Sequence, residues 1–221
     1  MKKCSFPDLF SNYAEIILHK NKDAKILDFG SGSGRMVAFL LENGFVNVEA
    51  ADIDEKALRD IEQKHHVKTH LLKDASAFLE SVSKMYDVII AKDVLYYFSA
   101  KELIPVLKNF NNALKKGGVF IAEIFNGSTC AGPYIKYKDI GIQLILTEHS
   151  LRHALSQAGF ELKTMKGDKF PIKGVKSFLF SNLQIFWRLR LRAMYFFERG
   201  IDDQNPKILT RKIIAVAKAN S

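Results

Sequence analysis

Short apolar runs alternate with amphipathic stretches along most of the chain. The runs predict seven strands, over residues 25–29, 46–51, 67–72, 86–91, 119–125, 160–165 and 212–219. Apolar residues at helical spacing predict helices over residues 9–20, 35–43, 55–65, 75–83, 99–116 and 147–157. Pro105 lies inside one of these helices and predicts either a kink or a start one turn later. The alternation of strands and helices predicts an α/β fold with a doubly wound sheet and helices on both faces.

Two segments are longer than the connections that this alternation of strands and helices requires. Residues 126–150 contain a loop of about 20 residues, which is longer than a structural connection usually is. Residues 170–207 form an insertion between the sixth and seventh strands, within what we expect to be a single domain over 1–221. Ser181 and Gln184 match a capping box and Gly200 suits a helix end, so a helix is expected between them.

The inserted helix is predicted to be amphipathic. Its apolar side carries six large residues: Leu183, Phe186, Trp187, Leu191, Met194 and Phe197. Arg188 and Arg192 lie on another side at i,i+4 spacing. This pattern is typical of a helix docked on its own domain or on a second subunit. It is equally typical of a helix that lies in a membrane interface, so residues 178–199 are a candidate for peripheral membrane contact.

Charge is unevenly distributed along the chain. Residues 1–162 hold 20 basic and 20 acidic residues, whereas residues 163–221 hold 13 basic and 4 acidic residues. The whole net charge of +9 therefore lies in the last quarter. Such asymmetry indicates an anionic partner for that end, such as a phosphorylated substrate, a membrane surface or RNA, or else a solvated basic face that binds nothing.

Cysteine usage and the N-terminus suggest a compartment. Cys4 and Cys130 are far apart and have no metal-ligand spacing, so we expect free thiols in a reducing environment and no metal site. The start of the chain has two lysines but no apolar stretch typical of a signal peptide. A cytoplasmic location is expected, with peripheral contact at the inner face of the membrane as a further possibility. The oligomeric state is left open.

A glycine loop follows the first predicted strand. Asp28 ends the apolar run, and Gly30, Gly32 and Gly34 occupy every second position of the loop that leads into the next helix. Glycine permits positive φ and lets a ligand approach the backbone N–H groups closely. Arg35 stands where a dinucleotide-binding loop would have its third glycine, so the spacing argues against a pyrophosphate ligand.

The spacing Asp-x-Gly-x-Gly-x-Gly resembles motif I of the class I S-adenosylmethionine-dependent methyltransferases. The resemblance covers residues 24–165 and 208–218. It implies a seven-stranded sheet with the last strand antiparallel, S-adenosylmethionine as cofactor, and transfer of a one-carbon group. An acid beside the loop suits a ligand with an amino-acid tail and a sulfonium better than it suits a pyrophosphate.

The same resemblance assigns the cofactor-binding positions. Asp52 is expected to accept the ribose hydroxyls, as acids after the second strand do in nucleotide-binding folds, and Ile53 to pack on the adenine. Asp74 and Ala75 match the position that contacts the adenine amino group, although Asp74 is also a suitable helix N-cap. Lys92 begins a segment that borders the methyl donor. The full expected set is Asp28, Gly30, Ser31, Gly32, Gly34, Asp52, Ile53, Asp74, Ala75 and Lys92.

Catalytic candidates follow the later strands, where the loops gather beyond the strand ends. Methyl transfer needs aligned reactants, and a hydroxyl acceptor profits from a base within hydrogen-bond reach. The candidates are Asp93, Tyr97, Asp139 and His149. A lone histidine at the start of a helix is more often structural. The substrate candidates are Asn126, Tyr134 and Tyr137.

From Asn126 onward the chain is similar to methyltransferases of bacterial surface-polysaccharide biosynthesis. That group often carries Asp-x-Thr-His in the loop, whereas this chain has Asp139-Ile-Gly-Ile, so the resemblance supplies no histidine base. It implies a small-molecule or lipid-linked glycan acceptor, modified at a sugar or sugar-linked group. The alternatives are an RNA or protein methyltransferase, which no base-modifying Asn/Asp-Pro-Pro-Tyr motif supports, and a non-catalytic membrane- or partner-binding module of the same fold.

Overall fold

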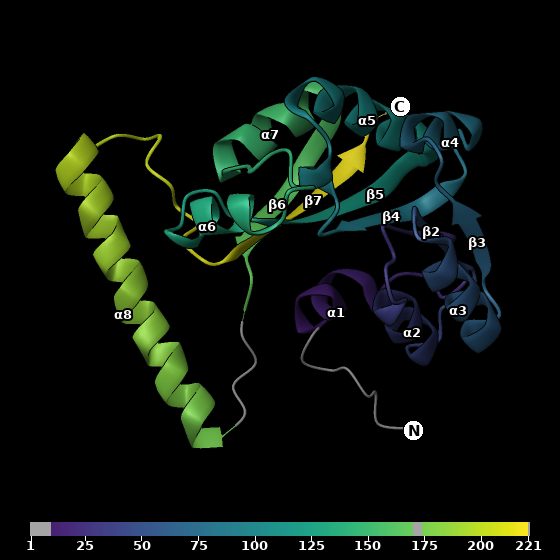
Figure 1. Cartoon of the computed structure of the whole chain (residues 1–221), viewed down its shortest axis with the longest axis horizontal. Helices are drawn as coiled ribbons and strands as arrows, with labels where there is room; N and C mark the ends of the chain where they lie inside the picture. The colour runs from purple at the N-terminus through teal and green to yellow at the C-terminus, as the bar shows by residue number, and fades with distance from the viewer. Residues whose placement is uncertain (1–9, 170–173, 221) are drawn as a thin grey trace.

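A single seven-stranded sheet runs through the protein (Figure 1). The computed structural model describes residues 10–169 and 174–220. The strand order is β3-β2-β1-β4-β5-β7-β6, and the strands are β1 (Ile26–Phe29), β2 (Val48–Asp52), β3 (Lys68–Leu71), β4 (Tyr86–Lys92), β5 (Leu114–Phe125), β6 (Phe160–Gly167) and β7 (Lys212–Ala219). β7 runs antiparallel to β5 and β6, while β1 to β5 pair in parallel. The predicted doubly wound, Rossmann-like fold with an antiparallel last strand is confirmed.

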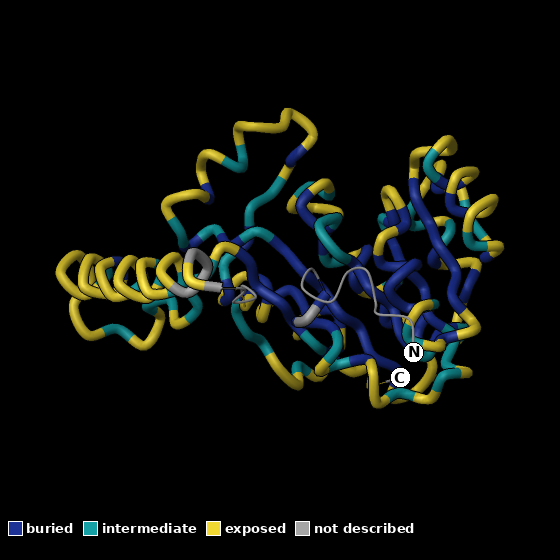
Figure 2. The backbone as a smooth tube through the Cα atoms, turned by 90° about the horizontal axis from the view of Figure 1, so that it is seen from below, coloured by how far each residue is buried: buried dark blue, intermediate teal, exposed yellow. Residues whose placement is uncertain are grey.

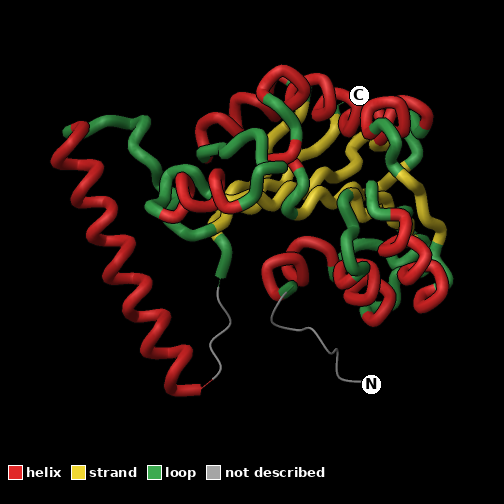
Figure 3. The backbone as a smooth tube through the Cα atoms, in the orientation of Figure 1, coloured by secondary structure: helices red, strands yellow, loops and turns green. Residues whose placement is uncertain are grey.

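Helices cover both faces of this sheet (Figures 1 and 3). One face carries α1 (Ser11–Ile17), α2 (Arg35–Glu42) and α3 (Glu55–His65). The other face carries α4 (Ala75–Ser81), α5 (Ala100–Ala113) and α7 (Glu148–Gln157). A short 3₁₀ helix, η1 (Leu95–Tyr97), follows β4, and α6 (Ala131–Lys138) lies in the connection after β5. The longest helix, α8 (Gly174–Arg199), lies apart at one end of the molecule (Figure 1).

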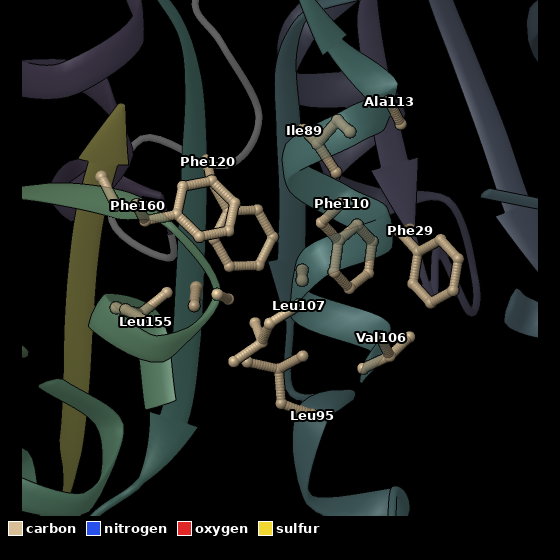
Figure 4. Packing of buried hydrophobic residues seen from close by; sticks show 14 of the residues in the cluster. Phe29, Ile89, Leu95, Val106, Leu107, Phe110, Ala113, Phe120, Leu155 and Phe160 are labelled. Carbon is tan, nitrogen blue, oxygen red and sulfur yellow. The ribbon is translucent and has the colours of Figure 1, made fainter. Parts of the chain in front are cut away.

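Aromatic side chains hold α5 against the sheet (Figure 4). The rings of Phe29 and Phe110 meet edge-on at 4.8 Å, and Phe110 lies 5.0 Å from Phe120. Phe120 stacks on Phe160 at 5.1 Å. These four rings link β1, α5, β5 and β6, and all are at most 5% exposed. Because each buried aromatic ring removes a large apolar area from water, this row fixes the sheet on which the site is built.

The boundary between α5 and β5 differs from the prediction. Residues 114–116 were expected to end the helix, but they begin β5, where Leu114 pairs with Tyr86. The register then shifts, so that Val119 pairs with Val88. Gly117 takes a φ of 72° at this irregularity, which a side chain would resist. α5 begins at Ala100 and continues past Pro105. Of the two outcomes predicted from Pro105, a kink or a start one turn later, the later start is therefore wrong.

The inserted helix is longer than predicted. α8 begins at Gly174, so Ser181 lies inside the helix and its capping-box match is false. The helical spacing of apolar residues extends back to Val175, and this outweighs the local capping signal. The predicted end is confirmed, since Gly200 has a φ of 73° and its N–H donates to the Phe196 carbonyl at 2.8 Å. In the part of the chain that the structure describes, no helix is long and apolar enough to cross a membrane.

Two further expectations concerned the cysteines and a metal site. Cys130, just before α6, is exposed and in the free form. Cys4 lies outside the described residues, as do the first and last positions of the chain. Among the described side chains, no group of three or more His, Cys, Asp and Glu is placed to hold a metal ion.

Residues from β1, β2, β4 and β5 meet at the edge where parallel strands end, and ligands bind at that edge in doubly wound sheets.

Candidate active site

The glycine loop between β1 and α2 contains three glycines with positive φ, a conformation that residues with a side chain rarely adopt. Gly30, Gly32 and Gly34 have φ values of 75°, 49° and 73°. A Cβ at Gly30 would lie 2.8 Å from the Val94 side chain, and one at Gly34 would lie 2.6 Å from Ile61. A Cβ at Gly32 would meet nothing within 4 Å. Gly30 and Gly34 therefore pack the loop onto the fold, while Gly32 faces open space where a ligand can approach.

Asp52, at the end of β2, fastens this loop from the neighbouring strand. One carboxylate oxygen accepts the Gly32 N–H at 2.7 Å, and the other accepts the Asp54 N–H at 3.0 Å. The side chain is 9% exposed and borders a cavity of about 580 Å³ between the loop and α3. Each carboxylate oxygen can accept further hydrogen bonds. Asp52 is thus positioned to receive a pair of hydroxyl groups.

A second, smaller cavity lies on the other side of the loop. Its volume is about 170 Å³, and its lining includes Asp28, Ser31, Arg35 and Lys92. The Asp28 Oδ2 and the Ser31 Oγ are buried and receive no hydrogen bond from the described part of the chain. Burial raises the pKa of Asp28 to about 7, and the nearby Asp52 adds to the shift while Lys92 opposes it. Buried polar atoms usually have partners, so two unsatisfied oxygens on one cavity indicate a polar ligand.

Beside this cavity, two lysines and two acids form a cluster in which Lys212 and Glu123 are buried and Lys92 and Asp93 are half-buried. Lys212, at the start of β7, donates to Asp93 and to Glu123, the latter at 2.6 Å. Lys92 pairs with the same two acids and lies 3.0 Å from Glu123. Burial would raise the pKa of Glu123, but Lys212 and Lys92 outweigh it and hold that pKa below its usual range. The four charges balance one another, which makes their burial tolerable.

Asp93 takes an unusual conformation within the cluster. Its φ is 58°, in the left-handed region, and its N–H donates to the Glu123 carbonyl at 2.9 Å. Both lysines bind its Oδ2, while its Oδ1 is buried without a partner among the described residues. Strained backbone of this kind persists only where neighbours enforce it, and it is frequent at functional sites. Asp93 remains a candidate for contact with bound reactants.

Two of the predicted catalytic side chains meet. The Tyr97 hydroxyl, at the end of η1, donates to the Asp139 Oδ2 at 3.2 Å. The other oxygen of Asp139 accepts the Gly141 N–H at 2.9 Å. Burial and the neighbouring Asp139 raise the pKa of Tyr97. The Tyr97 side chain is 46% exposed, so this pair faces solvent at the ligand-binding edge of the sheet.

His149 lies on α7, next to Glu148. Its Nε2 lies 3.8 Å from the Glu148 Oε1 on α7. Glu148 in turn accepts the N–H groups of Lys207 and Ile208, at 3.1 Å and 2.6 Å. Among the described residues, no hydrogen bond or ion pair joins His149 to Tyr97, Asp139 or Asp93, and its catalytic role stays a prediction.

Asn126 is fully buried, although it was expected to contact the substrate. Its amide donates to the carbonyls of Ile208 and Thr210, at 2.8 Å and 3.0 Å. Its oxygen accepts the Ser128 N–H at 2.9 Å. In this structure the amide joins the end of β5 to the segment before β7 and is not presented to a bound molecule. The two carbonyls that accept from its amide lie more than 80 residues away in the sequence, so no local pattern indicated this structural role.

The remaining predicted positions are exposed, except Ala75, which is half-buried against the core. Ile53 is 79% exposed next to Asp52, where a flat ring could cover it. Asp74 caps α4 by accepting the Ala77 N–H at 3.0 Å, and Ala75 follows it in the first turn. Tyr134 and Tyr137 on α6 are 69% and 84% exposed. Their roles in binding adenine or an acceptor stay predictions.

A third cavity, of about 330 Å³, lies between α8 and the body of the protein. It is lined by the start of α6, by α8 and by the segment before β7, with Arg188, Arg211, Thr129, Thr210, Cys130 and Trp187 among its residues. Arg211 lies 3.6 Å from the buried Asp168, whereas Arg188 forms no ion pair with a described residue. The Tyr195 hydroxyl donates to the Ser128 carbonyl at 2.9 Å and joins α8 to this loop.

The fold and the glycine loop define a class of nucleoside-binding transferase. The family model described as "Methyltransferase domain" matches residues 4–164, which is more than half of the chain. The chain belongs to this family, and it is an S-adenosylmethionine-dependent methyltransferase. The match ends before α8 and β7. No match was found among curated protein sequences.

Solved structures share the fold at low sequence identity. A methyltransferase from Archaeoglobus fulgidus is 17% identical with a TM-score of 0.66, and the alignment covers 95% of this chain and 93% of that one. One from Mesorhizobium loti is 14% identical with a TM-score of 0.66, over 95% and 97%. A putative methyltransferase from Bacillus halodurans is 16% identical with a TM-score of 0.63, over 95% and 98%. At these identities the likeness shows the fold and leaves the acceptor open.

The chain's own residues fit S-adenosylmethionine. The unsatisfied Asp28 and Ser31 oxygens would hold the amino-acid end, with Arg35 at the rim for its carboxylate. Asp52 would hold the ribose and Ile53 would cover the adenine. When bound, the cofactor supplies an electrophilic methyl group. Arg35 was not among the predicted cofactor positions, although its place in the first turn of α2 brings it to the lining of the cavity that Asp28 and Ser31 line. Sequence reasoning also missed Glu123 and Lys212, which only the sheet pairing brings to the site.

Proposed function

We propose that this methyltransferase methylates a sugar or a sugar-linked group of a bacterial surface-polysaccharide precursor. The observation that carries the proposal is the cavity beside α8, which is lined by Arg188 and Arg211 together with Thr129 and Thr210. Arginine binds phosphoryl oxygens in a planar, two-pronged geometry, and hydroxyl side chains suit a sugar. This chemistry fits a phosphorylated sugar better than an apolar acceptor.

The position of the cavity also supports the proposal. Asn126 ties the end of β5 to Thr210, one of the cavity's residues. The next residues, Arg211 and Lys212, join the cavity to the charge cluster at Asp93. An acceptor held in the cavity would therefore lie beside the edge of the sheet that carries the cofactor residues. Positioning of this kind can supply about 7–11 kcal/mol of the barrier reduction in a two-substrate transfer.

The Tyr97–Asp139 pair is the best candidate for handling the acceptor's proton. A carboxylate in hydrogen-bond reach of an acceptor hydroxyl can take its proton as that oxygen bonds to carbon. The Asp139 carboxylate is held by the Tyr97 hydroxyl and by the Gly141 N–H, which fix its direction. His149 has no part in this arrangement. We assign the base role to Asp139 and a positioning role to Tyr97.

Acceptor screening with labelled cofactor tests the proposal. Purified protein and methyl-tritiated S-adenosylmethionine would be incubated with nucleotide sugars, with sugar phosphates, with lipid-linked oligosaccharide and with total RNA. We expect label in the sugar-containing acceptors. Label in RNA alone, with an affinity that falls steeply with salt, would instead support the nucleic-acid alternative.

Arg188 gives the sharper test once an acceptor is found. Arg188→Gln removes one of the two arginines that line the cavity and should raise KM for a phosphorylated acceptor about tenfold or more. Arg190→Gln is the matched control, because Arg190 is exposed on the same helix and lines none of the cavities described above. Equal KM values for the two variants would contradict a role for the cavity in acceptor binding.

A further inference from the structure

Helix α8 contacts the protein through one narrow stripe. The partly or fully buried residues among its described side chains are Ser181, Gln184, Arg188, Leu191 and Tyr195. They recur at spacings of three and four, so they lie on one side of the helix. Only Leu191 among them is a large aliphatic residue, and it is 3% exposed. The side that holds the helix in place is therefore mostly polar.

The opposite side is apolar and uncovered. Val175, Leu179, Leu183, Phe186 and Phe197 form a second stripe at helical spacing. Their exposed fractions range from 57% to 83%, and none lines a cavity described above. Figure 2 shows α8 as an almost continuous exposed tube at the end of the molecule. This distribution corrects the sequence-based assignment of one apolar side, because Leu191 faces the protein while Phe186 and Phe197 face away from it.

Charge indicates what covers the outer stripe. Residues 179–199 contain four arginines and one acid, Glu198. Arg190 is the arginine that lies within the stripe, between Phe186 and Phe197, whereas Arg188 lines the inner cavity and Arg199 pairs with Asp202. Two copies of α8 packed through this stripe would bring the Arg190 side chains of both copies into a desolvated seam, where like charges repel. An anionic lipid surface instead accepts apolar side chains below its headgroups and pairs Arg190 with a phosphate.

We infer that the outer stripe of α8 docks the enzyme on an anionic lipid surface, with the helix lying parallel to that surface. A helix of 26 residues is about 39 Å long, which gives an extended contact. The acceptor cavity lies against the inner side of the same helix. The inference rests on the proposed function in one respect, since it places that cavity next to a lipid-linked acceptor.

Vesicle co-sedimentation tests the inference without cofactor or acceptor. The full chain would be mixed with vesicles of equal parts phosphatidylglycerol and phosphatidylcholine, and with vesicles of phosphatidylcholine alone, in 100 mM salt. We expect binding to the anionic vesicles, with at least tenfold weaker binding to the neutral ones. Phe186→Ser combined with Phe197→Ser should lower the affinity for anionic vesicles at least tenfold. Arg190→Gln should lower it about fivefold.

Matched controls lie on the body of the protein. Val46→Ser combined with Leu71→Ser removes two exposed apolar side chains far from α8 and should leave binding unchanged. Lys101→Gln on α5 removes the same charge as Arg190→Gln and should also have no effect beyond twofold. Circular dichroism and cofactor binding would show that each variant is folded.

Two outcomes would overturn the inference. One is the absence of binding to anionic vesicles. If light scattering then shows a dimer that Phe186→Ser/Phe197→Ser dissociates, the outer stripe is covered by a second copy of the chain. The other is equal binding by the α8 variants and their controls. Both are distinguishable from failure of the proposed function, because methylation of a water-soluble sugar phosphate needs no vesicle.

Discussion

The glycine loop and helix α8 differ in which groups they bury. The loop region buries charged groups, whereas α8 leaves large apolar side chains exposed. Around the loop, glycines are packed against Val94 and Ile61, and the buried acids Asp52 and Glu123 are held by a backbone N–H group and by lysine. Along α8, a polar stripe holds the helix and large apolar side chains remain exposed. Substitutions should therefore act through folding and cofactor binding at the loop, and through contacts with other molecules at α8.

Gly30→Val should have the largest effect. A β-branched residue at a φ of 75° is strained, and its Cβ would meet Val94 at 2.8 Å. We expect a loss of about 4–6 kcal/mol in unfolding free energy, from backbone strain and overpacking together. Gly44→Val is the control, since Gly44 has a φ of 86° but open space around it, and should cost only about 1–3 kcal/mol. Urea unfolding measures both, and equal losses would contradict the packing role of Gly30.

Asp28 should make the stability of the protein depend on pH. Its pKa is about 7 in the folded protein, mainly because of burial, and about 4 in the unfolded chain. The folded state thus holds a proton that the unfolded state has lost between these pH values. Stability should fall by up to about 4 kcal/mol as pH rises from 4 to 7, and Asp28 should add no further change above that range.

Asp28→Asn measures this contribution. The amide cannot ionise, so the variant should lose much less stability than the wild type between pH 5 and pH 8 in urea unfolding. Asp74→Asn, at an exposed helix cap, controls for the general effect of replacing an acid. An identical pH dependence in wild type and Asp28→Asn would show that Asp28 ionises normally in the folded protein.

On α8, the inner and outer stripes should differ in their effect on stability. Leu191→Ala removes a buried side chain and should cost about 2–3 kcal/mol. Phe186→Ala, at 67% exposure, should change the unfolding free energy by no more than about 0.5 kcal/mol. Thermal unfolding of the two variants checks this, and a larger loss from Phe186→Ala would mean that the outer stripe is covered in the isolated protein.

The sequence predicted the loop region well because its signals are local. Strand β1, the three glycines and Asp52 lie within 27 consecutive residues, and their spacing alone indicates a strand, a turn and a helix. The N-cap role of Asp74 could also be read directly from the chain.

The other half of the site depends on contacts that are distant in sequence. Lys212 reaches Asp93 across 119 residues because β7 pairs with β5, and no local pattern announces this. Asn126 resembles a binding residue after a strand, but its amide is used by residues 208 and 210. For α8, the apolar pattern predicted a helix but not which of its sides would face the protein.

The central claim is that the loop half binds S-adenosylmethionine independently of α8, and titration calorimetry with S-adenosylhomocysteine tests it most directly. The wild type should bind at one site with a micromolar Kd. Asp52→Ala should bind about 100-fold more weakly, because two hydrogen bonds to a charged group are lost. Phe186→Ser/Phe197→Ser should bind as the wild type does. Absence of binding by the wild type, or unchanged binding by folded Asp52→Ala, would contradict the account.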